Sequence, residues 1–292
     1  NKGSQTVTSA IIDYAFVDDS CTAATALGSM EWNGTLEPGQ GVPVALPTRH
    51  LITGTTNVRI TVNVPGDTIF ADDTLHYQYH RFKVVTLVLN DNFENADIWY
   101  APRGYNEFSK NVWERGLTHK VNLVASHSDS TIWGTNLVGL VNHAGRGNLS
   151  YLYTPIIDIS QIRPDTIDFW LATDMSEDCY VNLEFIDYLN RWQIVGSPND
   201  TLWYNDGAGF VGSTSGYSYE HYRFSTNSIS GDFQQRIQFR LVFRAKPSSN
   251  PCDGAVVDDF RIGRAQRSVD VGVIQITHPV HPKFGQTIYP KA

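Results

Sequence analysis

The chain has 292 residues, with 22 Lys or Arg against 30 Asp or Glu, so its net charge is −8. This acidic balance argues against nucleic acid and anionic membrane surfaces as partners, because both are bound by basic faces. A membrane-spanning helix needs roughly 18 apolar residues in a row, and the apolar run VVTLVL at 84–89 is far shorter. The length exceeds that of a usual single domain, which predicts two domains.

The first 82 residues read as short β-strands separated by turn-forming sequences. In NVRITVNV, the residues Val58, Ile60, Val62 and Val64 alternate with polar ones, as in a strand with one solvent-exposed face. Segments such as EPGQG and ITGTT, between the strand-like runs, are rich in turn formers. Five or six short strands over this length predict a small β-sandwich at residues 1–82.

A second unit is predicted over residues 84–265. RIQFRLVFR has the clearest alternation: one face carries Ile237, Phe239, Leu241 and Phe243, and the other carries Arg236, Gln238, Arg240 and Arg244. Long connections at 101–132 and 197–218 are typical of a jelly roll with irregular loops. The predicted class is therefore all-β, a small sandwich followed by a jelly-roll sandwich. Residues 268–292 begin a further strand pattern that is too short to fold alone, and we interpret them as the start of another module.

Several motifs together resemble a known family. NVWERG, STIWGTNLVGLVNHAGRGNLSYLYTPIIDIS and GAVVDDFRI resemble the MAM-like jelly-roll modules related to cleaved-adhesin domains of secreted Bacteroidetes proteins. The sequence departs from the family pattern W-x-x-G-x-P at Leu117 and Thr118. Residues 1–82, with MEWNGTLEPGQGVPVALP, resemble the Ig-like modules that alternate with these jelly rolls, and DVGVIQITHPV resembles the opening of another.

The resemblance implies a fragment of a large, multi-module protein that is secreted or held at the bacterial cell surface. It implies export through the type IX secretion system, a role in adhesion or gliding motility, and surface glycans or other cell-surface and secretion proteins as partners. The expected function is a non-enzymatic adhesive module or rigid spacer. A carbohydrate-binding module is the alternative, and an accessory module of an exported peptidase is the second. The sequence contains no HExxH, P-loop or nucleophile-elbow motif.

Four carboxylates form the predicted metal site. A jelly roll often places its first and last strands side by side, and NDNFEN and VVDDF are those segments. Asp91, Glu94, Asp258 and Asp259 are therefore predicted to surround one structural Ca²⁺, a cation that takes six to eight oxygen ligands. In the simpler alternative, one Asp caps a turn and the other is solvated.

Aromatic residues in the loops form the predicted ligand-binding site. LWYNDGAGF and GYSYEHYRF contain Trp203, Tyr204, Tyr217, Tyr219 and Tyr222, which could stack on sugar rings. Alternatively, these rings pack back on the sandwich, as a long ordered loop requires.

The three cysteines, Cys21, Cys179 and Cys252, are compatible with one disulfide, of which Cys179–Cys252 is a candidate pairing, or with none.

Overall fold

The computed structural model describes residues 1–18, 26–48, 53–86, 88–95, 98–102, 111–142, 147–196, 203–204, 209–248 and 250–264. In this part of the chain the regular elements are β-strands, with four single-turn 3₁₀ helices, η1–η4 (Phe70–Asp72, Ser215–Tyr217, Thr226–Ser228 and Ser230–Asp232). The predicted all-β class is confirmed. None of the described helices is long and apolar enough to span a bilayer. Cys21 and the predicted module start at 268–292 lie outside the described residues.

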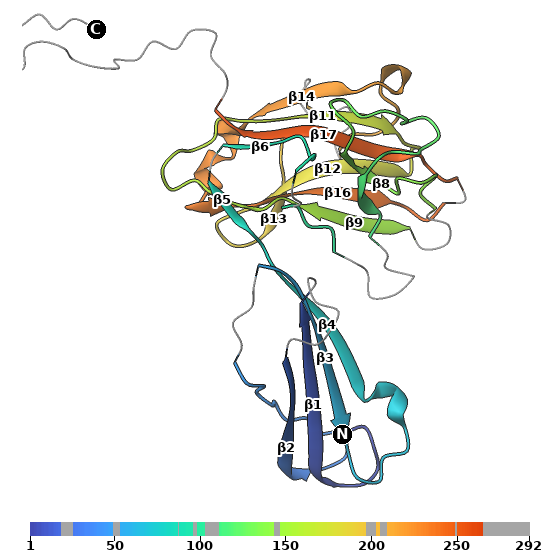
Figure 1. The fold of residues 1–292 in the computed structure, drawn as a ribbon, viewed down its shortest axis with the longest axis vertical. Coiled ribbons are helices and arrows are strands. Elements are labelled where there is room, and N and C mark those ends of the chain that lie inside the picture. The colour runs from blue at the N-terminus through green and yellow to red at the C-terminus, as the bar shows by residue number, and fades with distance from the viewer. Residues whose placement is uncertain are drawn as a thin grey trace, which may run out of the picture.

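The sheet unit, residues 1–82, is one antiparallel sheet with the strand order β2-β1-β3-β4 (Figure 1). Its strands are β1 (Val7–Asp18), β2 (Ala26–Leu36), β3 (Gly54–Asn63) and β4 (Thr74–Arg81). An Ig-like sandwich has two sheets, and the described residues of this unit form only one. The Ig-like assignment therefore stays a prediction.

The sandwich unit, residues 84–264, contains two larger sheets and a small one. The six-stranded sheet has the order β14-β11-β17-β8-β7 with β6 also paired to β17, the four-stranded sheet has the order β13-β12-β16-β9, and the small sheet has the order β15-β10-β5. The strands are β5 (Val84–Thr86), β6 (Leu89–Asp91), β7 (Trp113–Gly116), β8 (Ile132–Thr135), β9 (Asn148–Tyr153), β10 (Ile156–Asp158), β11 (Thr166–Asp174), β12 (Cys179–Ile186), β13 (Trp192–Ile194), β14 (Glu220–Ser225), β15 (Arg236–Ile237), β16 (Phe239–Ala245) and β17 (Gly254–Gly263).

The apolar core lies between the two larger sheets. Phe239, Leu241 and Phe243 of β16 are completely buried in it, whereas Arg240 and Arg244 are only partly buried on the outer face. The alternation predicted from RIQFRLVFR is thus confirmed. Burying a side chain of this size stabilises the fold by about 1.5–3 kcal/mol. The largest fully buried side chains include Trp203, Phe169, Phe210, Phe239, Phe243 and Phe260.

The opening and closing segments of the sandwich unit lie side by side, as predicted. Asp91 of β6 pairs with Phe260 of β17, and Leu89 pairs with Ile262. The chain therefore leaves the unit next to the point where it entered the six-stranded sheet.

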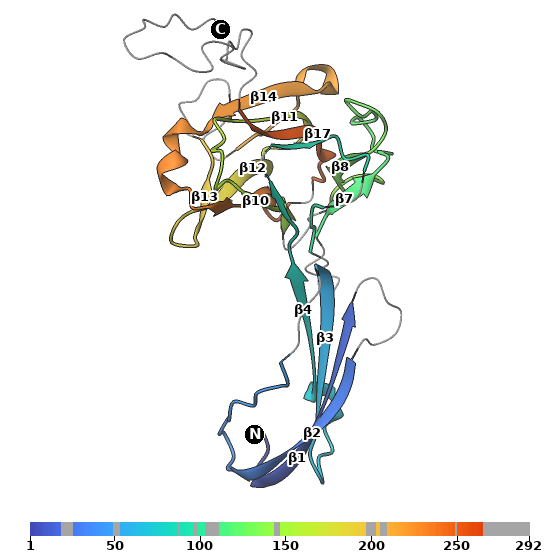
Figure 2. The same cartoon turned by 60° about the vertical axis from the view of Figure 1, so that its left-hand side comes forward.

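The two units meet at the end of β4 (Figure 2), where aromatic side chains form a junction. His80 of β4 stacks on Tyr100 with 3.5 Å between ring centroids, and the Tyr100 hydroxyl donates to Gln78 Oε1 at 2.9 Å. Beyond β4, Phe82 packs against both Tyr100 and Tyr153. Two residues further on, β5 begins and pairs in parallel with β10. Stacked rings and a paired strand therefore flank this short connection on both sides.

Candidate binding site

Asp258 and Asp259 occupy a β-bulge. Across β11 and β17, Asp168 pairs with Arg261 and Trp170 with Asp258, so β17 contains one extra residue at this point. Asp259 has a φ of 49°, in the left-handed region that Asp tolerates better than most residues. The bulge lets Val257 and Phe260 both enter the core, and places both carboxylates on the outer face.

The carboxylates at the bulge are bonded to the loop that covers them. Asp258 is completely buried and accepts hydrogen bonds from the backbone N–H groups of His127, Ser128 and Asp259 at 2.8–3.0 Å. Burial raises the pKa of Asp258 to about 6, although these donors oppose the shift. Asp259 contacts His127 Nδ1 at 2.6 Å and accepts from the Ser128 hydroxyl at 2.9 Å.

Glu94 and Asp91 have separate donors. The Glu94 carboxylate accepts from the backbone N–H groups and hydroxyls of Ser130 and Thr131, which lower its pKa. Asp91 accepts from Phe93 N at 2.8 Å and from Trp99 Nε1 at 3.1 Å. In the described part of the chain, no three His, Cys, Asp or Glu side chains lie in an arrangement that could hold a metal ion. The structure therefore does not gather the four predicted ligands into one set, and calcium binding stays a prediction.

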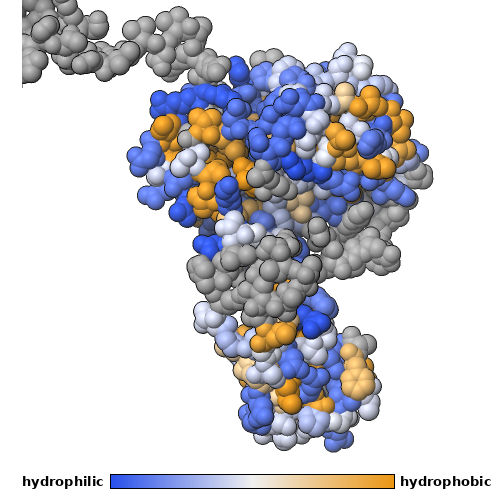
Figure 3. Space-filling model, in the orientation of Figure 1, coloured by the Kyte–Doolittle hydropathy of each residue, from blue (hydrophilic) through white to orange (hydrophobic). Residues whose placement is uncertain are grey.

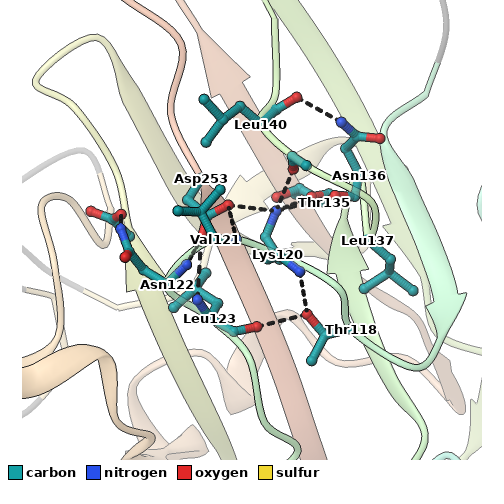
Figure 4. Close-up of polar contacts among 12 residues, drawn as sticks. Thr118, Lys120, Val121, Asn122, Leu123, Thr135, Asn136, Leu137, Leu140 and Asp253 are labelled. Atoms are coloured by element: carbon teal, nitrogen blue, oxygen red, sulfur yellow. Dashed lines mark hydrogen bonds and ion pairs between the residues drawn. The ribbon is translucent and has the colours of Figure 1, made fainter.

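A buried lysine supplies a cation before β17 (Figure 4). The Lys120 ammonium donates to the carbonyls of Thr135, Asn136 and Gly139 at 2.7, 3.2 and 3.3 Å, and lies 3.5 Å from Asp253 Oδ1. Both charged side chains are completely buried. Burial lowers the pKa of Lys120, and the Asp253 carboxylate opposes this shift. The sequence gives no sign of this pair, because a lone loop lysine is usually solvated.

The predicted loop platform is wrong for Trp203 and Tyr204, which lie in the core. Trp203 is 1% exposed, donates from Nε1 to the Val195 carbonyl at 2.9 Å and packs against Phe169. The Tyr204 hydroxyl is equally enclosed, because it bonds the backbone of Leu183. Burial raises the pKa of Tyr204 far above its usual value. The chain returns to the sheet here, since Phe210 forms a bridge with Val181.

The other three predicted ligand-binding residues do not form a shared surface. Tyr222 packs against Phe210 and donates to Glu220 Oε2 at 2.7 Å. Tyr219 packs edge-on against His127, and its hydroxyl is buried. Only Tyr217 is largely exposed.

Aromatic residues gather instead on the outer face of the four-stranded sheet. Tyr153, Arg240 and Glu184 pair across β9, β16 and β12, so their side chains lie in one row. The guanidinium carbon of Arg240 lies 4.4 Å from the ring centroid of Tyr151 and 4.1 Å from that of Trp192. Trp192 also packs edge-on against Tyr153. We call Tyr151, Tyr153, Glu184, Trp192, Arg240 and Arg244 the outer-face cluster.

Charges in the outer-face cluster are fixed by direct bonds. Arg240 donates to Glu184 Oε2 from Nε at 2.8 Å and from a terminal nitrogen at 2.5 Å, and Arg244 donates to Oε1 at 3.0 Å. Two guanidinium groups thus share one carboxylate, which leaves a net positive charge. Arg240 is held between aromatic rings, a geometry that favours the cation, while the side chain of Arg244 remains 35% exposed.

The outer-face cluster combines apolar ring faces with fixed charged groups. Its half-buried rings offer apolar faces, and its arginines and carboxylate offer fixed hydrogen-bonding groups. Aromatic and arginine side chains of this kind are enriched in binding surfaces. The cluster continues into the junction, because Tyr153 also contacts Phe82 and Tyr100.

The two buried cysteines lie together without forming a disulfide. Cys179 and Cys252 are both buried in the core, and neither forms a disulfide. A hydrogen bond to Cys179, together with burial, raises the pKa of Cys252 far above its usual value. The Cys252 thiol is therefore protonated at neutral pH.

Comparison with known proteins gives only distant similarity. No family model matches the sequence, and no curated protein matches it. Among solved structures, the K1 cleaved-adhesin domain of Lys-gingipain from Porphyromonas gingivalis is 12% identical, with 61% of this chain and 99% of that one covered and a TM-score of 0.35. SGBP-B from a xyloglucan utilization locus in Bacteroides uniformis is 12% identical, with 89% and 69% covered and a TM-score of 0.33. TmCBM61, solved with β-1,4-galactotriose, is 9% identical, with 61% and 87% covered and a TM-score of 0.30. Similarity at this level carries no functional argument.

Proposed function

We propose that the sandwich unit is a non-catalytic carbohydrate-binding module whose ligand lies on the outer-face cluster. The observation that supports this most directly is the Arg240–Glu184 pair framed by Tyr151, Tyr153 and Trp192. Sugar rings present apolar C–H faces and polar rims. The aromatic rings of the cluster suit the apolar C–H faces of a sugar, and its fixed charged groups suit the polar rim.

We further propose that this binding serves adhesion by a protein that is secreted or displayed at a bacterial surface. Type IX export and a role in gliding belong to this proposal and are supported by the motif resemblance alone. The aromatic junction supports the rigid-spacer part of the expected function, because it holds the sheet unit against the sandwich unit. No feature of the described residues favours the peptidase-accessory alternative.

Glycan binding can be tested with one variant and one matched control. The full chain is screened on a glycan array, and the strongest ligand is then titrated by calorimetry. Trp192→Ala removes a half-exposed ring from the cluster and is expected to weaken binding at least tenfold, within the ~1–3 kcal/mol range of one stacked ring. Tyr217→Ala removes the exposed ring of the loop predicted from sequence, and is expected to leave affinity unchanged.

Each outcome assigns the site differently. Loss of binding in Tyr217→Ala with retention in Trp192→Ala would move the site back to the segment around η2, which contains Tyr217. Equal affinity in both variants and the parent chain, or no glycan bound by the parent chain, would contradict the proposal. Circular dichroism of each variant checks that the sandwich is intact.

A further inference from the structure

The outer-face cluster has an excess of one positive charge. On the outer face of β9, β12, β13 and β16, Glu184 is the only acidic side chain, whereas Arg240 and Arg244 are both basic. The chain as a whole is acidic, with a net charge of −8. Hydropathy does not distinguish this face, because hydrophilic and hydrophobic groups are interspersed over the visible surface of the sandwich unit (Figure 3). The distinguishing feature of the face is therefore its charge.

Arg240 is already engaged within the cluster. Its Nε and Nη2 groups donate to Glu184 Oε2, and its Nη1 group donates to the Tyr153 hydroxyl at 3.3 Å. Its side chain is only 12% exposed. All three nitrogens of this guanidinium thus have a protein partner, so Arg240 compensates the charge of Glu184 and is not the group that meets a bound anion.

Arg244 has donors to spare. Among the described residues its guanidinium makes one hydrogen bond, from Nη2 to Glu184 Oε1, so Nε and Nη1 remain for a ligand. In register it lies opposite Leu149 and Tyr180. Four residues separate it from Arg240 along β16, or about 13 Å. Because it still reaches the carboxylate that lies opposite Arg240, its side chain extends along the strand toward the aromatic rings of the cluster.

The free donors of Arg244 suit a carboxylate. A guanidinium presents its N–H groups in a planar fork that matches the two oxygens of a carboxylate. An excess of one positive charge suits a ligand with isolated carboxylates, whereas densely charged polyanions such as nucleic acids need many basic groups. In glycans, isolated carboxylates belong to acidic sugars, namely uronic and sialic acids.

We propose that the glycan bound by the outer-face cluster contains an acidic sugar, and that Arg244 binds its carboxylate while the aromatic rings of the cluster contact the C–H faces of the chain. This inference rests on the proposed carbohydrate-binding function, and adds the class of the ligand and the residue that selects it. Arg244 sets the specificity for the acid, whereas Trp192 contributes to the binding of any sugar chain.

Matched oligosaccharides test the proposal on the full chain. Fragments of polygalacturonate and of alginate, and sialyllactose, are titrated by calorimetry, each beside the same compound after chemical reduction of its carboxylates to alcohols. At least one carboxylated probe is expected to bind about tenfold more tightly than its reduced form, as for hydrogen bonds between charged groups. Because reduction leaves the sugar rings in place, the ratio of the two affinities measures recognition of the carboxylate. The pairs that show a preference distinguish uronic from sialic acids.

A charge-removing variant then assigns this preference to one residue. Arg244→Gln is expected to bring the affinity ratio close to one. Glu184 keeps both hydrogen bonds from Arg240 in this variant, so the face is expected to stay folded, which circular dichroism checks. The control Arg223→Gln removes an exposed arginine of β14, in the other large sheet. It changes the net charge by the same amount and is expected to leave the ratio unchanged.

The outcomes separate this inference from the proposed function. If reduced or neutral glycans bind as tightly as the carboxylated probes, and Trp192→Ala weakens that binding, the module binds glycans without selecting the acid and the inference is wrong. If neither acidic nor neutral glycans bind, both proposals are wrong. A preference that persists in Arg244→Gln places recognition of the carboxylate elsewhere, which also overturns the inference. A preference lost in Arg244→Gln and kept in Arg223→Gln supports it.

Discussion

Asp253 and Asp258 are two buried carboxylates whose negative charges are compensated in different ways. Asp253, directly before β17, and Asp258, within it, are both almost completely buried. Each accepts three backbone N–H bonds: Asp253 from residues 121–123, and Asp258 from residues 127, 128 and 259. Asp253 has in addition the ammonium of Lys120. Among the described ion pairs, Asp258 has no such partner.

The two sites separate the effect of backbone N–H dipoles on a buried carboxylate from the effect of a full positive charge. Three N–H donors surround each group, at 2.8–3.4 Å from Asp253 and at 2.8–3.0 Å from Asp258, yet the pKa of Asp258 is still raised to about 6. Backbone donors alone therefore do not offset the loss of water around a buried carboxylate. At Asp253, the Lys120 ammonium also links the carboxylate to the loop carbonyls of Thr135, Asn136 and Gly139. The loop over the six-stranded sheet is thus fixed at one end by an ion pair and at the other by an acid that can take up a proton.

The largest effect is expected on removing the cation. Lys120→Met keeps most of the side-chain volume but leaves Asp253 charged, buried and without a counterion. Breaking one partner of a buried ion pair costs about 3–5 kcal/mol, and urea unfolding is expected to show a loss of that size. Lys83→Met changes an exposed lysine and is expected to alter the free energy of unfolding by less than about 0.5 kcal/mol. Equal, small losses in both variants would show that the Lys120–Asp253 pair does not stabilise the fold.

A smaller effect is expected from the titration of Asp258. Its folded-state pKa, about 6, lies above the usual value of 3.8 for an aspartate, so the folded state holds its proton more tightly. The resulting stabilisation is complete below pH about 4 and is lost as pH rises through about 6. One proton limits the slope to about 1.4 kcal/mol per pH unit. Thermal or urea unfolding between pH 4 and 8 is expected to show this decline, and Asp258→Asn is expected to remove it. Parallel profiles for the two proteins would contradict the assignment.

Alternation along single strands was enough to predict the fold class and the inner face of β16. The same alternation placed Arg240 and Arg244 on the outer face. It did not reveal their partners, because Glu184 and Tyr153 lie 56 and 87 residues away and the register between strands has no local signal. Tyr151 and Tyr153 are two residues apart in NLSYLY, so the alternation could place these two members of the outer-face cluster on one face of a strand.

The remaining differences between the predictions and the structure have local causes, which the alternation of apolar and polar residues does not reveal. Adjacent strand residues normally face opposite sides, so the bulge that puts Asp258 and Asp259 on one face could not be inferred. Trp203 was predicted in an exposed loop, but that loop returns to the sheet at Phe210 and buries its rings. The predicted pairing of β6 with β17 was correct and brought Asp91 near the end of the last strand. Donor groups from the loop at 127–131, which the sequence did not place, then bonded Glu94, Asp258 and Asp259 separately.

The smallest effect on stability is expected from calcium. Adding or removing it tests whether hydrogen-bond donors or a bound cation compensate the charges of the four predicted ligands. A Ca²⁺ ion bound only by the folded chain would stabilise it by mass action, and a chelator would then lower the melting temperature by several degrees. If the hydrogen-bond donors that each predicted ligand already has compensate its charge in full, the melting temperatures in chelator and in millimolar Ca²⁺ will differ by less than about 1 °C. Calorimetric scans in the two buffers measure this, and Glu94→Gln is the control, since it removes one predicted ligand and keeps most of the side-chain hydrogen bonds. A fall of several degrees in chelator that disappears in Glu94→Gln would restore the predicted ion. It would also mean that Asp258, like Asp253, relies on a cation, with the pH dependence of stability present only when calcium is removed.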